Sequence, residues 1–469
     1  MISASPALSS VSSLEKEPEP TVNASLPRRH WFHSVFFNLT IVGWCAFLSP
    51  GIFNSMSALG GGGRQEPYLA NSANSIVFGL MVVTCYFGST ITNKIGYRWS
   101  VVLGTLGFFP YATGLYENKM KGTEWLVLFG AVCCGASAGL FWSVEGAMVM
   151  GYPEPRKRGR YLAYWLGFRN AGMILGGAIN LGLNASNSKA GSISSSTYIV
   201  FIVLQAISPL VGFLVSNPSQ VWRPDNSAVK LEKRQSFRAE MGDIWKVIKR
   251  KEILLLFPIS LYAQWSSGYT GSFLTIHYSV RSRALGSFLV AVSAVIVNAI
   301  LGFFLDNQSF SKKFKARSSY LTIMALLGGC WIWFTVLELK YGKEAVSPKF
   351  DWTDAGWAVG FVLYLIFNCL YFLLQNELYW TISQCAREPS ELIQLSSLLR
   401  GLESAGSACA FGISASKQLP KTVPLGINFG LYGLALFTAW FTVKEIGVKF
   451  GLEEESKSEV EGRLEKIEK

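Results

Sequence analysis

The stretch WLVLFGAVCCGASAGLFWSVEGAMVM, residues 125–150, decides the fold because it carries a single charged side chain, Glu145. A helix needs about 20 apolar residues to cross the hydrocarbon core of a bilayer, so this stretch is long enough to span one. Its glycines and alanines allow helices to pack closely in lipid. The stretch therefore predicts a transmembrane helix that buries one carboxyl group.

The composition of the whole chain agrees with this prediction. Of its 469 residues, 50% are hydrophobic and 15% are charged, whereas a soluble domain carries roughly 25% charged residues. The mean hydropathy is +0.31. These values argue against a soluble enzyme, and no nucleophile, base and oxyanion donor stand together in the sequence. We expect a polytopic membrane protein and not an enzyme.

Twelve apolar stretches of membrane-spanning length divide the chain six plus six around one long polar loop. They lie at 34–56, 70–92, 99–117, 125–150, 161–183, 197–216, 254–278, 286–305, 320–339, 356–380, 396–416 and 425–443. The expected fold class is an all-α membrane protein with twelve transmembrane helices in two six-helix bundles. The domains are a disordered tail at 1–30, bundles at 31–216 and 253–443, a basic central loop at 217–252 and a charged tail at 444–469.

The positive charge follows the expected topology. Loops on the side of the two termini hold 21 basic residues, whereas loops on the opposite side hold 11. Because cytosolic loops of membrane proteins are enriched in Lys and Arg, both termini are expected in the cytosol. The net charge of +12 then has the anionic lipid of the inner leaflet as its partner, and no nucleic acid is expected. Whether the membrane is the plasma membrane or an endomembrane stays open.

No metal or cofactor is expected. The three histidines lack the spacing of a metal site, and seven of the eight cysteines lie in apolar runs as small core residues. The run Gly60–Gly63 lacks the Lys-Ser/Thr ending of a phosphate-binding loop, so it is interpreted as a flexible turn. His277, at the end of the seventh stretch, is interpreted as an interfacial residue.

Charges inside the expected spans are few, and they repeat between the two halves. Glu145 and Arg169 lie 24 residues apart, and Glu377 and Arg400 lie 23 apart, with Glu403 close behind. Because a charge in lipid is costly unless it is paired or hydrated, each needs a reason. In one interpretation these residues form gate pairs that close the cytosolic mouth. In another they neutralise each other within each half, and in a third Glu145 or Glu377 carries a proton.

Two loops carry a recognisable signature. Residues 89–98 (STITNKIGYR) resemble the loop of the major facilitator superfamily, a Gly-x-Leu-Ala-Asp-Arg-x-Gly-Arg-Lys run that turns tightly between two helices. A related run at 302–306 keeps the Gly and the Asp, as expected of transporters built from parallel repeats. Asn93 stands where the family has Asp. The residues at signature positions are Asn93, Lys94, Gly96, Arg98 and Asp306.

A further element narrows the resemblance. Arg158, Gly159 and Arg160, after the fourth stretch, look like the Arg-Gly-Arg element of sugar porters of this superfamily. Together with 135–142 (GASAGLFW) and 170–180 (NAGMILGGAIN), the chain resembles the fungal Unc-93-like family over about residues 31–450. The resemblance implies the major facilitator fold. It implies less about function, since some animal relatives are described as trafficking or channel-regulating partners.

Polar and aromatic side chains within the spans are candidates for a substrate cavity at the midplane. The alternative is that the amides hold helices together and the aromatics anchor at the interfaces. The set suggests a neutral or weakly charged organic solute. The candidates are Asn54, Trp142, Asn170, Gln264, Trp265, Tyr269, Asn368, Gln375 and Asn376.

Two functions follow from these observations. The first is a secondary active transporter of an unidentified small organic solute, in which two bundles alternate access to a central cavity and Glu/Arg pairs form the inner gate. The second is a non-transporting escort or channel-regulatory partner of another membrane protein. The charges within the spans favour the transporter, because an escort need not switch between states.

Overall fold

The structure is a computed structural model that describes residues 30–450 apart from 65, 155–156, 224–228, 230–241, 243–244, 345–346, 388 and 421. Most of the two predicted tails and of the central loop therefore lies outside the described residues. Nearly all of the two predicted bundles is described.

The two halves of the described chain are helical throughout. The first half contains η1 (Trp31–His33), α1 (Val35–Ala46), η2 (Phe47–Gly51), α2 (Ile52–Ser57), η3 (Gly61–Gly63), α3 (Tyr68–Ile95), α4 (Tyr97–Leu106), α5 (Phe108–Lys121), α6 (Trp125–Gly151), α7 (Arg158–Asn184) and α8 (Ser195–Gly212). After η5 (Pro218–Gln220), the second half contains α10 (Lys251–His277), α11 (Val280–Asp306), α12 (Lys312–Tyr341), α13 (Trp357–Cys385), α14 (Pro389–Ser414) and α15 (Thr422–Val443).

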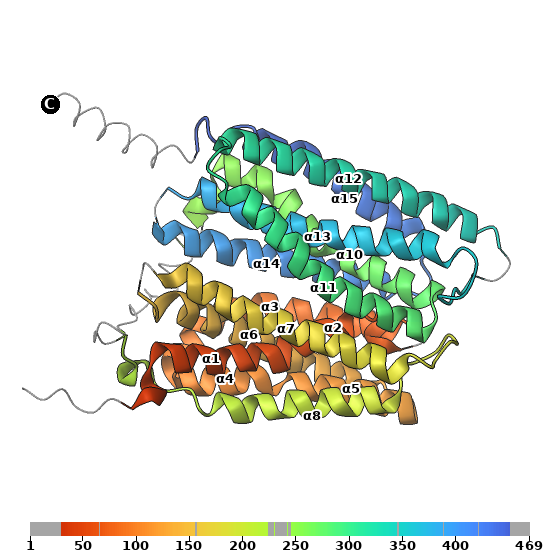
Figure 1. The fold of residues 1–469 in the computed structure, drawn as a ribbon, viewed down its shortest axis with the longest axis horizontal. Coiled ribbons are helices and arrows are strands. Elements are labelled where there is room, and N and C mark those ends of the chain that lie inside the picture. The colour runs from red at the N-terminus through yellow and green to blue at the C-terminus, as the bar shows by residue number, and fades with distance from the viewer. Residues whose placement is uncertain are drawn as a thin grey trace, which may run out of the picture.

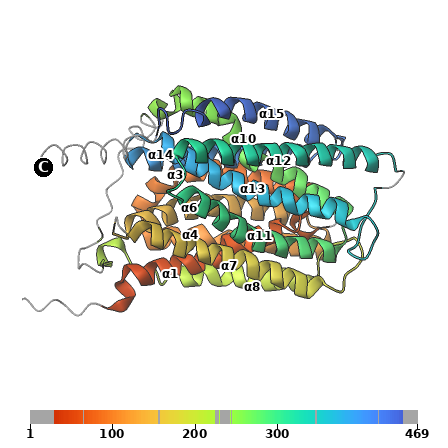
Figure 2. The ribbon, with the colours of Figure 1, turned by 45° about the horizontal axis from the view of Figure 1, so that its top comes forward.

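Figure 1 shows the two halves side by side, with α1–α8 in one bundle and α10–α15 in the other. The beginning of α1 and the end of α15 lie at the same end of the molecule, here called the terminal side; the opposite end is called the far side (Figures 1 and 2). Each of the twelve predicted spans corresponds to one helix or to one run of consecutive helices. The expected fold class is confirmed.

Eight segments of the described chain are long and apolar enough to cross a membrane by these criteria alone. The four remaining predicted spans are formed by α4–α5, α7, α10 and α14. The pair α4–α5 is divided near Gly107, and the other three carry polar or charged residues in their middle turns, among them Arg169, Gln264 and Arg400. The weaker hydropathy of these three helices therefore coincides with the positions predicted for the site.

Local sequence sets where several helices begin and turn. Ser34, Ser279 and Ser311 each accept a hydrogen bond from a backbone N–H in the first turn of the helix that follows, which satisfies a donor that has no partner within the helix. Between α3 and α4 the chain turns at Gly96, whose φ of 86° is rarely adopted by residues with a side chain. Arg98 Nε then donates to the carbonyl of Val215 at 2.6 Å, which ties this turn to the end of α8.

The first span is broken in its middle. Pro50 lies inside η2, a π-helical turn between α1 and α2, and a proline removes one hydrogen bond of the regular helix. The glycines of α7 pack directly against this break. A Cβ on Gly172 would lie 2.4 Å from the carbonyl oxygen of Phe47, and one on Gly176 would lie 2.1 Å from Ser55 Oγ. The glycine face of α7 thus allows two helix backbones to touch.

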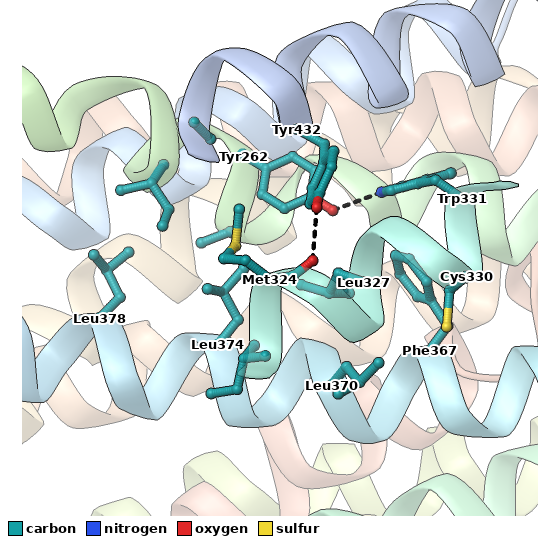
Figure 3. Close-up of a cluster of buried hydrophobic side chains, with 14 of the residues drawn as sticks. Tyr262, Met324, Leu327, Cys330, Trp331, Phe367, Leu370, Leu374, Leu378 and Tyr432 are labelled. Atoms are coloured by element: carbon teal, nitrogen blue, oxygen red, sulfur yellow. Dashed lines mark hydrogen bonds between the residues drawn. The ribbon is translucent and has the colours of Figure 1, made fainter. Parts of the chain in front are cut away.

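Each half has its own hydrophobic core. In the second half, Trp331 Nε1 donates to the hydroxyl of Tyr262 at 2.7 Å, and the Tyr432 hydroxyl donates to the carbonyl of Met324 at 2.6 Å (Figure 3). The core of the first half also includes Val280 and Ala284 from the far-side end of α11. The halves are therefore separately packed bodies that share apolar contacts at the far side.

The contact at Gly172 generates a stability prediction. Gly172→Ala is expected to lower the free energy of unfolding by about 1–3 kcal/mol, because the added methyl group overlaps the Phe47 carbonyl. The matched control is Gly182→Ala on the same helix, where nothing lies within 4 Å and alanine favours the helix. Thermal unfolding of the purified proteins measures the difference; equal stability of the two variants would contradict the close contact.

Candidate functional site

The two halves meet along two pairs of helices. In the interface α3 packs against α14, and α7 packs against α11. All hydrogen bonds that join described residues of the two halves lie on the far side, at or beyond the level of the Ser75 hydroxyl, which donates to the carbonyl of Ala408 at 2.8 Å. Within the described residues, the hydrogen bonds between the halves therefore lie at one end of the interface.

Arg283 is the centre of this far-side fastening. Its guanidinium is fully buried and donates to three backbone carbonyls of the first half, those of Leu59 at 2.8 Å, Gly60 at 2.8 Å and Gly191 at 3.0 Å. Burying the charge of an arginine in a membrane costs free energy unless its N–H groups have acceptors, and three carbonyls of the opposite half supply them here. The sequence indicated only a basic loop residue here, so Arg283 is a residue that sequence analysis missed.

The glycine run beside Arg283 is a packed turn, so its interpretation as a flexible turn was wrong. All four residues, Gly60–Gly63, have φ between 51° and 79°, a backbone region that residues with a Cβ atom rarely adopt. A Cβ on Gly60 would lie 2.4 Å from the carbonyl oxygen of Gly271 in α10. The run lets the first half approach the backbone of the second half closely.

Further polar contacts reinforce the far side. Asn180 Nδ2 donates to Ser287 Oγ at 3.0 Å, and Asn71 Nδ2 donates to Ser272 Oγ at 3.0 Å. Arg281, in the first turn of α11, pairs with Asp351 of the loop after α12, and its guanidinium holds the pKa of that carboxyl below the usual range, chiefly by hydrogen bonding. The two amide contacts join neutral groups across the halves, whereas the Arg281–Asp351 pair lies within the second half. An exposed ion pair, Lys417 with Glu66 at 3.1 Å, also joins the halves on this side.

Near the middle of the helices, Trp142 lies close to two arginines that come from different halves. The Cζ atom of Arg400 in α14 lies 4.7 Å from the centre of the indole ring, and that of Arg169 in α7 lies 5.7 Å from it. A guanidinium over an indole face is attracted by the negative face of the ring, most strongly where water is scarce. Trp142 of α6 thus connects the first half to a charge of the second.

Arg400 forms its ion pair within its own helix. Its Nη1 lies 3.3 Å from Glu403 Oε2, one helical turn away, and the Glu403 side chain is fully buried. The same oxygen accepts hydrogen bonds from the Tyr379 hydroxyl at 3.2 Å and from Gln264 Nε2 at 3.5 Å. The result is a polar cluster built from α10, α13 and α14.

The predicted partners Glu145 and Arg169 do not form an ion pair within 4.0 Å in the described structure, and neither do Glu377 and Arg400. Glu145 is only 2% exposed, and its Oε2 has no hydrogen-bond partner among the described residues. The charges of Arg169 and Arg400 nevertheless both act on it. Four charged groups, two of each sign, therefore lie near one another with one direct ion pair among them.

The depth of the cluster differs from the expected position at the cytosolic mouth. Arg169 and Arg400 each lie eleven residues from the terminal-side ends of their helices, or about 16 Å at 1.5 Å per residue. Both helices have 26 or 27 residues, about 40 Å in length. The two arginines therefore lie close to mid-depth, where a solute site of a two-bundle protein is expected.

Glu377 belongs to a different environment. It is 1% exposed and lies inside the second half, beside a cavity of about 10 Å³ that Leu256, Tyr320 and Thr381 help to line. Its Oε1 accepts a hydrogen bond from the Thr381 hydroxyl at 3.5 Å, and its Oε2 has no partner in the described structure. The cavity is about the size of one water molecule. Glu377 thus repeats Glu145 in sequence and not in surroundings.

The cavity candidates are only partly gathered in one place. Trp142 and Gln264 belong to the central cluster, whereas Tyr269 is buried in the second half and donates to Glu338 Oε1 at 3.2 Å. Asn368 donates to the carbonyl of Tyr364 in its own helix, and Gln375 donates to the hydroxyl of Tyr371. Partial or full exposure is shared by the remaining candidates Asn54, Asn170, Trp265 and Asn376. Their role in a cavity stays a prediction.

His277 is the last residue of α10 and lies at the far-side end of this helix, so its interpretation as an interfacial residue stays a prediction. Its side chain is fully buried, its Nδ1 lies 3.1 Å from the carbonyl oxygen of Pro348, and its ring lies beside Glu338.

Most of the signature residues are exposed on the terminal side, namely Asn93, Lys94, Arg160 and Asp306, whereas Arg98 is partly buried. Arg158 and Gly159 lie in the first turn of α7, and their surroundings are outside the described part of the structure.

A helical membrane protein with two six-helix halves and a charged centre between them has the architecture of a membrane transporter. The family model of the Major Facilitator Superfamily matches residues 35–384. The chain belongs to this superfamily and, within it, to the Unc-93-like family.

Relatives from fungi and plants are similar over most of the chain. A notoamide biosynthesis cluster protein of Aspergillus versicolor is 37% identical, with 93% of each chain covered. UNC93-like protein 1 of Arabidopsis thaliana is 28% identical over 89% of this chain and 93% of the relative. An UNC93-like protein of Schizosaccharomyces pombe is also 28% identical, over 81% and 76%.

Solved structures with very different solutes share the fold. A D-xylose-proton symporter superposes with a TM-score of 0.61 at 13% identity, covering 88% of this chain and 98% of that one. A peptide transporter in complex with alafosfalin gives 0.61 at 12% identity, covering 90% and 96%. Because sugar and peptide transporters are equally similar, the fold does not identify a solute.

The contrast between the two buried glutamates can be tested. Glu403→Gln is expected to lower the free energy of unfolding by on the order of 2 kcal/mol, because it leaves the guanidinium of Arg400 without its carboxylate. Glu377→Gln is expected to cause no loss, because no cation lies within ion-pair distance of that carboxyl in the described structure. Chemical unfolding in detergent measures both; equal losses would show that Glu377 has a partner.

Proposed function

We propose that this protein is a secondary active transporter of a small organic solute that works by alternating access. The single observation that carries the proposal is the distribution of contacts across the interface. Hydrogen bonds between the described halves are confined to the far side, while unsatisfied charges lie near mid-depth. With both termini in the cytosol, this arrangement corresponds to a state closed to the outside.

The far-side contacts are of a kind that can be broken and remade. Apart from Arg283 and the exposed Lys417–Glu66 ion pair, they join neutral amides, hydroxyls and backbone groups, so separating them exchanges protein hydrogen bonds for bonds to water. Because each half has its own core, the two can rock as bodies about α3–α14 and α7–α11. Opening of the far side would then accompany closure of the terminal side.

The central charges are proposed to change partners during this motion. Arg400 contacts Trp142 of the opposite half and pairs with Glu403 of its own, so a rocking motion alters the first contact and preserves the second. We propose Trp142–Arg400 as the contact between halves that responds to the state of the transporter. Glu145, Arg169, Arg400 and Glu403 form the proposed gate set, and Glu377 is placed outside it.

The Aspergillus versicolor relative is named as a protein of a notoamide biosynthesis cluster. We infer from it that the solute of this chain is an organic product or precursor and not a simple ion. The alternative, an escort or channel-regulatory partner, remains the second function for an Unc-93-like protein. The two differ in whether function requires the halves to move.

A disulfide lock separates the two functions. Asn71→Cys combined with Ser272→Cys replaces a 3.0 Å hydrogen bond between the halves by a pair of thiols, and oxidation is expected to hold the far side closed. Metabolite profiles of cells should then match those of cells lacking the protein, and dithiothreitol should restore them. The control pair, Asn184→Cys with Thr197→Cys, lies within the first half and should have no such effect. An oxidised lock that keeps the wild-type profile would contradict alternating access.

A further inference from the structure

Arg169 differs from Arg283 and Arg400, the other arginines described at the interface, in having no acceptor. Arg283 has three backbone carbonyls, and Arg400 has the carboxylate of Glu403. The guanidinium of Arg169 makes no hydrogen bond or ion pair with any described residue, and the ring centres of Trp142 and Trp165 lie 5.7 and 5.9 Å from it. Five N–H donors near mid-depth are therefore available to another group.

The surroundings of Arg169 place it between the halves. Besides Glu145 of its own half, its electrostatic neighbours are Arg400, Tyr371 and Tyr379 of the second half. Its side chain is partly exposed, whereas Glu145 beside it is buried. A guanidinium that is partly accessible, faces the opposite half and lacks an acceptor has the properties of a ligand-binding group.

We propose that Arg169 is the anion-binding residue of the central site and that the transported solute carries a carboxylate. This inference rests on the proposed transport function and names the class of its substrate. It revises the expectation of a neutral or weakly charged organic solute, because that expectation assumed that no central charge is left unpaired.

The number of arginines in the cluster without a direct partner indicates the charge of the anion that the site can bind. A carboxylate is a planar monoanion that accepts two parallel hydrogen bonds from one guanidinium. A phosphate monoester carries nearly two negative charges and requires further donors or cations. Since Arg400 is already paired with Glu403, Arg169 is the cation of this cluster left without a direct partner. The cluster is therefore suited to a monoanion.

The aromatic neighbours define how the carboxylate is held. Trp142 and Trp165 lie against the guanidinium at 5.7 and 5.9 Å from their ring centres, and their two rings pack edge to face. These rings fix the position of the guanidinium without consuming any of its N–H donors. Lysine cannot reproduce the forked donor geometry, so Arg169→Lys is not a conservative change at this position.

The experiment uses the full-length protein in proteoliposomes that are incubated with a metabolite extract of the host cell. Compounds that enter protein-containing vesicles and not protein-free vesicles are identified by mass spectrometry, for the wild type, Arg169→Gln, Arg169→Lys and Lys340→Gln. Lys340 is exposed at the far-side end of α12, so Lys340→Gln removes one positive charge away from the site. Thermal unfolding confirms that each variant is folded before uptake is compared.

The expected result is that the compounds entering through the wild-type protein carry a carboxylate. Their uptake falls at least 100-fold with Arg169→Gln and about 10-fold with Arg169→Lys, and is unchanged with Lys340→Gln. Uptake of neutral or cationic compounds only, or equal uptake of carboxylates by folded Arg169→Gln, would overturn the carboxylate assignment while leaving transport intact. Absence of any protein-dependent compound would overturn the proposed function itself, and this inference with it.

Discussion

The constraint on which this structure depends is the cost of placing charge in the middle of a bilayer. Two arginines and two glutamates, from α6, α7 and α14, lie near one another at roughly the depth of the helix centres. Each would be costly alone, and only one direct ion pair, Arg400–Glu403, forms among them. Further contacts come from Trp142, whose indole ring lies close to an arginine of each half, and from Tyr379 and Gln264, which donate hydrogen bonds to Glu403. The centre is therefore held by weak contacts that can rearrange.

On the far side the two halves are joined by close backbone packing and hydrogen bonds. There the two halves touch closely through backbone, because Gly60 has no side chain to separate it from α10, and Arg283 gathers carbonyls from two loops. Most of the contacts are hydrogen bonds between neutral groups, which contribute modestly when they can exchange with water. In the proposed transport cycle these far-side contacts would break and re-form, and the unsatisfied charges at the centre would rearrange.

Much of this fold could be predicted from the sequence, because hydropathy and length alone constrain a membrane helix strongly. The turn at Gly96 was also predictable, since a loop signature places glycine where φ is positive. The role of Glu377 was not. Successive helical residues point about 100° apart, so a repeat in sequence spacing does not fix which face a residue shares with its partners.

Two parts of the site were missed by the sequence analysis for different reasons. The Arg400–Glu403 pair has the three-residue spacing of neighbours on a helix, so local rules could have identified it in preference to a pair with Glu377. Arg283 binds carbonyls more than 90 residues away in the chain, and backbone acceptors leave no pattern of residue types. The run of four glycines beside it was the available signal.

The contact between Trp142 and Arg400 is measured most directly by a double-mutant cycle on the stability of the purified protein. The free energies of unfolding of Trp142→Leu, Arg400→Gln and the double variant are compared with that of the wild type. The account predicts a coupling energy on the order of 1 kcal/mol between the two residues, the size of a cation–π contact away from bulk water. Additive effects, with no coupling, would show that the halves are not joined at this point and would contradict the account.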